Sequence, residues 1–253
     1  MLQDYKKPFY HFSIDDVIDS LIQVSDSSSD LFSNYFFEFL ETIHKKYDVK
    51  IDLYCFYQKI FQNKLRNLTE VSDQYKKIFI NNSWLRFGPH ALDYDSPPYA
   101  QLPDQQIDVF DSIYKEIERF TGNPSKCEFL RLHFFTESYE LSDYFQTHNI
   151  HSLFTTDKPD IAYRLDNDVK SILDSNGHVK FNKINFIRSH FRIETLVNEN
   201  FSDSEICKLI ENCLSKHEFV TFLTHERELI RPKVQTTIEF ILSYLKDHKI
   251  MSV

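Results

Sequence analysis

The sequence predicts an α/β fold, a distorted (β/α) barrel with about seven parallel strands. Strand-like runs alternate with segments of helical period along the chain, which favours parallel pairing because parallel strands need a crossover connection. The 253 residues suit one barrel, and no linker or internal repeat divides them. With 42% hydrophobic and 26% charged residues, the composition is that of a globular protein, so we expect residues 1–253 to form a single domain.

The expected strands are runs rich in aromatic and β-branched residues. They are Pro8–Ile14, Val49–Phe56, Trp84–Phe87, Glu128–Phe134, Ser152–Thr155, Ile184–Ile187 and Phe219–Leu223. Such runs, bounded by polar or turn-forming residues, are typical of the buried strands of a parallel sheet. Seven of them, each followed by helical sequence, fit a barrel better than an open sheet, although the pattern alone does not exclude the latter.

Segments with apolar residues on one helical face separate these runs. The clearest helices are expected over Leu31–Tyr47 and Ile107–Phe120. Ser202 and Asp203 indicate the cap of a helix that reaches about Lys216, and Arg231-Pro232 opens a last helix through Tyr244. The proline-rich stretch Asp93–Gln106 is expected to be a long surface loop.

The composition argues against several classes of function. A net charge of −9 disfavours nucleic-acid binding, and with only 3 glycines the chain has no glycine-rich phosphate-binding loop. The 4 cysteines form no C-x-x-C pair, so neither a thiol zinc site nor a disulfide framework is expected. The polar segment Met1–Pro8 does not read as an export signal, and there is no apolar run of about 18 residues, so we expect a cytoplasmic protein without membrane contact.

Two adjacent carboxylates follow the first expected strand. Asp15 and Asp16 would repel one another if they converge, unless a cation lies between them and their neighbours. One functional interpretation is a metal ligand beside a general base. The alternative is that one of them caps a helix beginning at Val17, since aspartate is a common capping residue.

Other polar side chains also follow or end expected strands. His90 comes after Gly88-Pro89, and could be a ligand or a surface histidine. Arg131 and His133 share one face of the fourth strand and need partners, such as the carboxylates of the first strand; Arg131 could equally be a structural ion pair. The fifth strand leads to Asp157, and the seventh to His225-Glu226. The carboxyl ends of barrel strands meet at one mouth, so we expect a site there.

These residues resemble the motifs of the polysaccharide deacetylase family, in the family's order and over nearly the whole chain. The matching segments are Ser13-Ile14-Asp15-Asp16, Gly88-x-His90, Phe129-Leu-Arg131, Asp157 and Leu223-Thr-His225. The resemblance implies a distorted (β/α) barrel that hydrolyses an N-acyl group, such as an acetyl group, on a sugar-like substrate.

The resemblance also implies roles for individual residues. Asp15 would be the general base, oriented by Arg131. Asp16 and His90 would bind a divalent metal, usually zinc. His225 would be the general acid, tuned by Asp157.

The sequence departs from the family pattern at several positions. A second histidine usually follows the first by four residues, but that position is Tyr94 here. Asp93 could supply an oxygen ligand instead, or His133 could reach the site from the fourth strand. Val17 replaces a glycine, and the third motif lacks its prolines. We therefore expect a divergent branch, in which Tyr94, His133 and Glu226 are candidates for contacts to substrate or ligand.

Two other functions remain open. The chain could be a catalytically inactive relative that kept the barrel, lost a metal ligand and binds carbohydrate through exposed aromatic residues. It could also be a glycoside hydrolase with two catalytic carboxyl groups, for which Asp15 with Glu226 or Asp157 would qualify.

Overall fold

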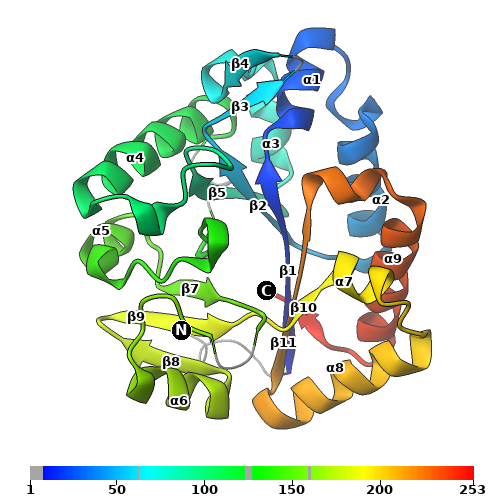
Figure 1. Ribbon diagram of the computed structural model, residues 1–253. Helices are drawn as coiled ribbons and strands as arrows, with labels where there is room; N and C mark the ends of the chain where they lie inside the picture. Colours follow the sequence, from blue (N-terminus) through cyan, green and yellow to red (C-terminus); the bar gives the residue numbers. More distant parts are fainter. Residues whose placement is uncertain (1–7, 62, 123–126, 159–160) are drawn as a thin grey trace.

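The computed structural model describes residues 8–253 except 62, 123–126 and 159–160. It confirms an α/β fold built on parallel strands (Figure 1). In the main sheet the strands lie in the order β10 (Phe191–Arg192), β11 (Phe219–His225), β1 (Phe9–Val17), β2 (Ile51–Phe56) and β5 (Leu85–Ala91), and all these pairs are parallel. The short strand β12 (Met251–Ser252) also pairs with the beginning of β1.

A second sheet contributes the remaining parallel strands. Its order is β6 (Phe129–Leu130), β7 (Ser152–Thr155), β9 (Ile184–Arg188) and β8 (His178–Phe181), with β8 antiparallel at the edge. A separate hairpin joins β3 (Gln58–Phe61) to β4 (Lys64–Asn67).

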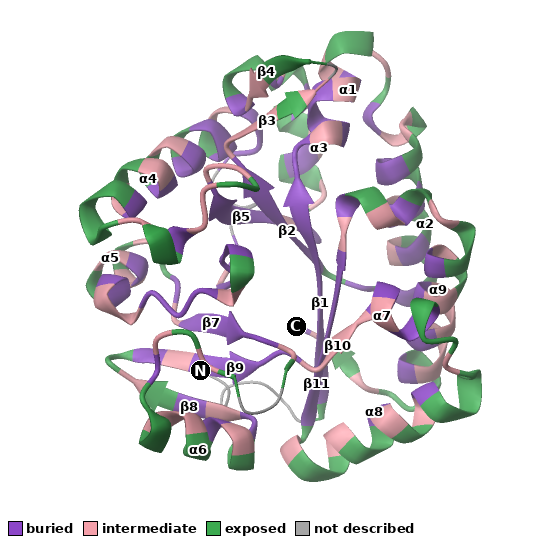
Figure 2. Ribbon diagram, viewed as in Figure 1, coloured by how far each residue is buried: buried purple, intermediate pink, exposed green. Residues whose placement is uncertain are grey.

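Helices surround the two sheets, and their outward faces are exposed while the central strands are buried (Figure 2). The helices are α1 (Asp19–Ser27), α2 (Tyr35–Tyr47), α3 (Lys76–Asn81), α4 (Pro103–Phe120), α5 (Ser142–Thr147), α6 (Asn167–Asn176), α7 (Ile193–Asn198), α8 (Asp203–His217) and α9 (Pro232–Asp247). Every residue of β1 and β2 is buried, as expected for central parallel strands covered on both faces.

Each expected strand run overlaps a strand of the structure, but the fourth strand is much shorter than predicted. Only Phe129–Leu130 pairs in a ladder, because the chain then turns through a short 3-10 helix, His133–Phe135, in which Phe134 and Phe135 have positive φ. The expected helix Leu31–Tyr47 is interrupted at Asn34, whose side chain caps the N-terminus of α2. The expected loop Asp93–Gln106 is also shorter, since α4 begins at Pro103.

The ladder of hydrogen bonds does not run continuously around a barrel. Among the described residues, no ladder joins β5 to β6 or β9 to β10. Isolated hydrogen bonds join the sheets instead. The Cys127 amide donates to the Phe87 carbonyl at 3.0 Å across the first of these seams. Between the end of β9 and β11, the His190 amide donates to Thr221 Oγ1 at 2.9 Å and the Thr221 amide donates to His190 Nδ1 at 3.1 Å. Gly88 allows the close approach at the first seam, since a Cβ there would lie 2.6 Å from Leu130 Cδ2.

The carboxylate of Glu226 joins the end of β11 to the start of α1. It accepts hydrogen bonds from the backbone amides of Ile18 and Asp19, each at 2.9 Å, and of Ser20 at 2.6 Å. The alternative that Asp15 or Asp16 caps this helix is therefore wrong. β1 continues to Val17, and the carboxylate of Glu226, the first residue after β11, satisfies the free amides at the helix N-terminus.

Replacing Glu226 by alanine should destabilise the fold without touching the pocket described below. Glu226→Ala leaves three backbone amides without this acceptor, two of them buried and that of Asp19 part-buried, and we expect a loss on the order of 3 kcal/mol in the free energy of unfolding. Urea unfolding followed by circular dichroism measures this loss. The control Glu41→Ala removes an exposed i,i+4 ion pair with Lys45 and should change stability by less than about 0.5 kcal/mol. Equal stability of the two variants would contradict the capping role.

Candidate functional site

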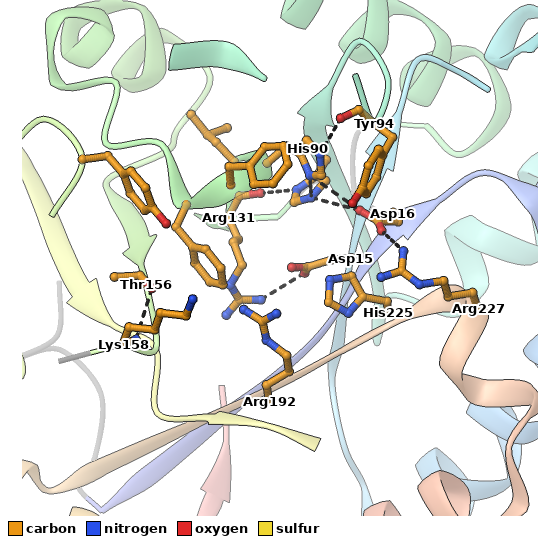
Figure 3. Close-up of a pocket in the computed structure, with 15 residues that line it drawn as sticks. Asp15, Asp16, His90, Tyr94, Arg131, Thr156, Lys158, Arg192, His225 and Arg227 are labelled. Carbon is orange, nitrogen blue, oxygen red and sulfur yellow. Dashed lines mark hydrogen bonds and ion pairs between the residues drawn. The ribbon is translucent and has the colours of Figure 1, made fainter. Parts of the chain in front are cut away.

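A cavity of about 220 Å³ opens at the carboxyl ends of the strands (Figure 3). Most of the polar residues expected at this mouth do line it. They are Asp15, Asp16, His90, Tyr94, Arg131, His133 and His225. They come from β1, from β5 and the loop after it, from the segment following β6, and from β11.

A distortion at the end of β1 turns both aspartates toward the cavity. Side chains of adjacent residues in a regular strand point to opposite faces of the sheet. Asp16 has a left-handed φ of 63°, and the pairing of β1 with β2 shifts register between Ile14 and Val17. This bulge allows Asp15 and Asp16 to line the same cavity. A left-handed aspartate is a local cost of the kind found at functional sites.

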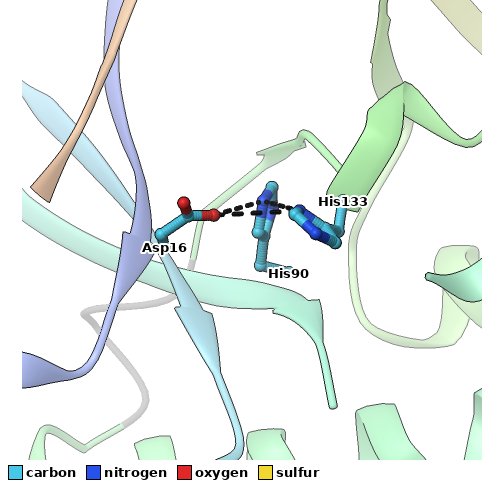
Figure 4. Close-up of side chains that lie close together, drawn as sticks. All are labelled: Asp16, His90 and His133. Carbon is cyan, nitrogen blue, oxygen red and sulfur yellow. Dashed lines mark hydrogen bonds and ion pairs between the residues drawn. The ribbon is translucent and has the colours of Figure 1, made fainter. Parts of the chain in front are cut away.

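Three potential metal ligands converge beside this bulge (Figure 4). Asp16 Oδ1 lies 3.4 Å from His90 Nε2 and 3.7 Å from His133 Nδ1, and the two histidine nitrogens are 3.2 Å apart. All three side chains are buried. Asp16 Oδ1 has no hydrogen-bond partner among the described residues, although it is shielded from solvent.

Backbone carbonyls determine which nitrogen of each histidine carries its proton. His90 Nδ1 lies 2.6 Å from the carbonyl of Arg131, and His133 Nε2 lies 3.0 Å from the carbonyl of Tyr94. A carbonyl only accepts hydrogen bonds, so these nitrogens are the donors and a neutral ring directs its lone pair from the other nitrogen. The lone pairs of His90 Nε2 and His133 Nδ1 therefore face Asp16 Oδ1. Hydrogen bonds of this type orient the histidine ligands of metal sites.

The electrostatics of the cluster also suit a cation. Burial alone would raise the pKa of Asp16, but its contact with His90 and the nearby His225 and His133 hold that pKa below the ordinary range. Burial and the neighbouring His90 lower the pKa of His133 to about 4, so this ring is neutral near pH 7. The cluster thus presents one carboxylate oxygen and two imidazole lone pairs, a ligand set that fits a divalent metal such as zinc.

Asp15 belongs to a different network. Arg131, only 1% exposed, donates from Nη1 to Asp15 Oδ1 at 3.1 Å and also contacts the hydroxyl of Ser13. The guanidinium lies 4.8 Å from the ring centre of Phe154, which restricts its position further. The cation therefore holds the Asp15 carboxylate in place from within the interior.

His225 pairs with Asp15 in the β1–β11 ladder, and Figure 3 shows its ring beside that carboxylate. Its Nδ1 lies 2.5 Å from Glu194 Oε1, while Thr224 donates a hydrogen bond to the other oxygen of Glu194. Burial disfavours the charged ring, but the hydrogen bond to Glu194 and the charge of Asp15 outweigh it, so the pKa of His225 is raised. His225 Nε2 remains for a proton transfer in the cavity.

Three residues expected at the site are engaged elsewhere. Asp93 accepts hydrogen bonds from the Gln58 side chain and the Asp95 amide. Asp157 pairs with Arg192 at 3.1 Å, and the carboxylate that contacts His225 is Glu194 rather than Asp157. Glu226 caps α1 as described above.

The sequence analysis did not select several other residues near the cavity. Lys158, Arg192 and Arg227 line it, and Arg227 pairs with Asp16 Oδ2 at 2.7 Å. Glu194 lies in the first turn of α7, where an acidic residue is ordinary, so no local signal distinguishes it. Lys158 and Arg192 do follow expected strands, a position that indicates the mouth, as the sequence shows for Arg192 after the sixth expected strand, but that gives neither residue a role.

No family model matches the sequence, and no curated protein matches it. Solved structures do resemble the chain. The 4-alpha-glucanotransferase from Thermococcus litoralis is similar with a TM-score of 0.58 and 11% identity over 97% of this chain, which spans 37% of that protein.

No helix in the described part of the chain is both long and apolar enough to cross a membrane.

Polysaccharide and peptidoglycan deacetylases are also among the similar structures. A protein described as a polysaccharide deacetylase involved in O-antigen biosynthesis, from Bordetella bronchiseptica, has a TM-score of 0.49 and 9% identity, with 96% of each chain covered. The catalytic domain of peptidoglycan N-acetylglucosamine deacetylase from Eubacterium rectale has a TM-score of 0.48 and 11% identity, with 99% of this chain and 90% of that chain covered. At such identities the likeness to solved structures concerns the fold alone.

Proposed function

We propose that the chain is a metal-dependent hydrolase that removes an N-acyl group, such as acetyl, from a sugar-like substrate. The observation that carries this proposal is the convergence of Asp16, His90 and His133 next to Asp15 and His225. The order of these residues in the sequence resembles the motifs of the polysaccharide deacetylases. We further propose that residues 1–253 form one catalytic domain, and a cytoplasmic location stays a prediction.

In this proposal Asp16, His90 and His133 hold the metal, with His133 in place of the expected Asp93. Zinc is the preferred ion, because one carboxylate and two imidazoles are common zinc ligands that leave room for substrate or water. When bound, such an ion polarises the acyl carbonyl and makes water more acidic.

Asp15 and His225 divide the proton transfers between them. The Asp15 carboxylate, fixed by Arg131, accepts a proton from the attacking water. His225 Nε2 donates a proton to the departing amine. Glu194 supports this role because it raises the pKa of His225 and so keeps the ring protonated to higher pH.

Exposed aromatic side chains at the rim support a sugar-like substrate. Tyr94, Phe134 and Tyr163 line the cavity, and each is at least 39% exposed. Tyr99 stacks parallel to Tyr163 and extends the aromatic surface away from the cavity. Flat, exposed rings of this kind can pack against the apolar faces of sugar rings while polar groups orient the hydroxyls.

The two alternatives receive less support. A carboxylate-pair glycoside hydrolase would use Asp15 with Glu226 or Asp157, but Glu226 is committed to three backbone amides and Asp157 to Arg192. The catalytically inactive relative was suggested by a missing metal ligand, and His133 supplies a third potential ligand.

Measuring the metal content of variants tests whether Asp16 and His133, rather than Asp93, bind the metal. Asp16→Ala and His133→Ala each remove one of the three converging atoms, so we expect zinc bound per chain to fall at least about tenfold at limiting zinc. Asp93→Ala is the matched control and should bind as much zinc as the parent, since Asp93 contacts Gln58 and Asp95. Mass spectrometry of desalted protein gives the stoichiometry. Loss of zinc in Asp93→Ala with retention in His133→Ala would reverse the assignment.

The pair Asp15 and His225 should control turnover rather than metal binding. Asp15→Asn and His225→Gln should each lower kcat for hydrolysis of N-acetylglucosamine oligomers by about 10²–10⁴-fold, the range of general acid–base groups. Zinc content should stay at the parent's level in both variants. Unchanged kcat in either variant would remove that residue from the mechanism.

The pH profile tests the role of Glu194. Activity should fall at alkaline pH as His225 loses its proton, and the folded-state pKa of that ring is raised by Glu194. Glu194→Gln removes the charge that supports the imidazolium, so the alkaline fall should move to lower pH. An alkaline fall that stays at the parent's pH would show that Glu194 does not act through His225. The pH of this alkaline fall is measured in the parent and in Glu194→Gln from hydrolysis rates with the same oligomers across pH 5–10, a range of about five units that includes the ordinary histidine pKa.

A further inference from the structure

The cavity is locally cationic although the chain as a whole is acidic. Within the described part of the chain, its charged lining comprises two aspartates and four lysine and arginine side chains, namely Arg131, Lys158, Arg192 and Arg227. The net charge of the whole sequence is −9. Such a contrast indicates a local potential that differs in sign from the rest of the molecule.

Two of the four cations are matched by the aspartates of the cavity. Arg131 pairs with Asp15, and Arg227 pairs with Asp16. Lys158 and Arg192 are left on the side of the cavity next to Arg131, away from His90 and Asp16 (Figure 3). A divalent ion at the proposed ligands would add further positive charge to the same cavity.

Neither remaining cation is fully satisfied within the described part of the chain. Arg192 gives one nitrogen to Asp157 at 3.1 Å, while its Nε is shielded from solvent and has no hydrogen-bond partner among the described residues. The Lys158 side chain is exposed and makes no ion pair with any described residue. The exposed Lys158 side chain is therefore available to a ligand, and the Arg192 guanidinium has more N–H donors than the one that binds Asp157.

The positions of both residues are held by other contacts. The Lys158 amide donates to Thr156 Oγ1 at 3.1 Å, and its carbonyl accepts from Arg188 at 3.3 Å. The Arg192 guanidinium lies 5.4 Å from the ring centre of Phe135, another residue of the cavity lining. The backbone of Lys158 and the guanidinium of Arg192 are therefore both held at the cavity wall.

We infer that the substrate is an N-acyl sugar carrying an anionic group, a carboxylate or a phosphate, and that Lys158 and Arg192 bind this group. The inference rests on the proposed function and names the substrate class for the same cavity. Among the described residues, a neutral sugar would leave Lys158 without an ion pair and Arg192 with Asp157 as its one carboxylate partner. A carboxylate or phosphate would accept charge-assisted hydrogen bonds from both, and the local positive charge would offset repulsion by the acidic protein.

Equilibrium binding of three sugars tests this inference. Isothermal titration calorimetry of the full chain, with and without added zinc, compares N-acetylglucosamine, its 6-phosphate and its uronic acid. At least one anionic sugar should bind about tenfold more tightly than the neutral one, and the preference should shrink as salt rises. The phosphate and carboxylate arms distinguish the two sources of charge. Equal affinity for all three sugars would overturn the inference.

Variants of Lys158 test whether this side chain, rather than the metal, causes the preference for anionic sugars. Lys158→Gln should reduce the preference for the anionic sugar by about tenfold, while Lys158→Arg should retain most of it. Lys64→Gln, on strand β4, removes the same charge from an exposed residue that does not line the cavity and should leave the preference unchanged. A preference that persists fully in Lys158→Gln would contradict the inference. Circular dichroism of each variant verifies folding.

Hydrolysis assays separate this inference from the proposed function. Hydrolysis of the neutral sugar with no binding preference for the anionic ones would overturn the inference and leave the hydrolase proposal intact. Charge-selective binding that Lys158→Gln removes, without hydrolysis of any sugar in the presence of zinc, cobalt or nickel, would support the anionic ligand and overturn the hydrolase proposal.

Discussion

The left-handed conformation of Asp16 is the constraint on which the site depends. It ends the regular alternation of β1, so that two neighbouring carboxylates enter one cavity. With regular pleating, one of them would point to the other face of the sheet, toward apolar packing. The chain then turns into α1, and Glu226 fixes that turn through three backbone amides. The bulge and the Glu226 cap together fix the end of β1, from which Asp15 and Asp16 enter the cavity.

Two adjacent carboxylates can coexist there because their partners differ. Asp15 faces the buried guanidinium of Arg131, whereas Asp16 faces two imidazole rings and the guanidinium of Arg227. Each carboxylate pairs with a guanidinium of its own, Asp15 with Arg131 and Asp16 with Arg227, which offsets the repulsion between the two negative charges. Their chemistry can therefore differ although they are neighbours in sequence, one suited to accept a proton and the other to ligate a cation.

The sequence indicated much of this arrangement because its signals are local. Buried strands are rich in apolar residues, and polar residues that follow them gather at one mouth, which identified Asp15, Asp16, His90, Arg131 and His225 as residues of a common cavity. The sequence could not decide whether Asp93 or His133 is the third proposed metal ligand. The position of His133 depends on how the segment after β6 turns through two residues with positive φ. Glu194 was missed for a similar reason: its contact with His225 spans 31 residues and leaves no trace in spacing.

The origin of the proposed ligands from distant segments has a consequence for how the protein matures. Asp16 and His90 belong to the main sheet, whereas His133 follows the first strand of the second sheet, 43 residues beyond His90. Metal sites built from closely spaced ligands can begin to form on a short, otherwise unfolded segment. Here the three atoms converge only after β5 and β6 have met across their seam. Ion capture would then be a late step that follows the docking of the two sheets, and a nascent chain lacking the second sheet would carry only part of the site.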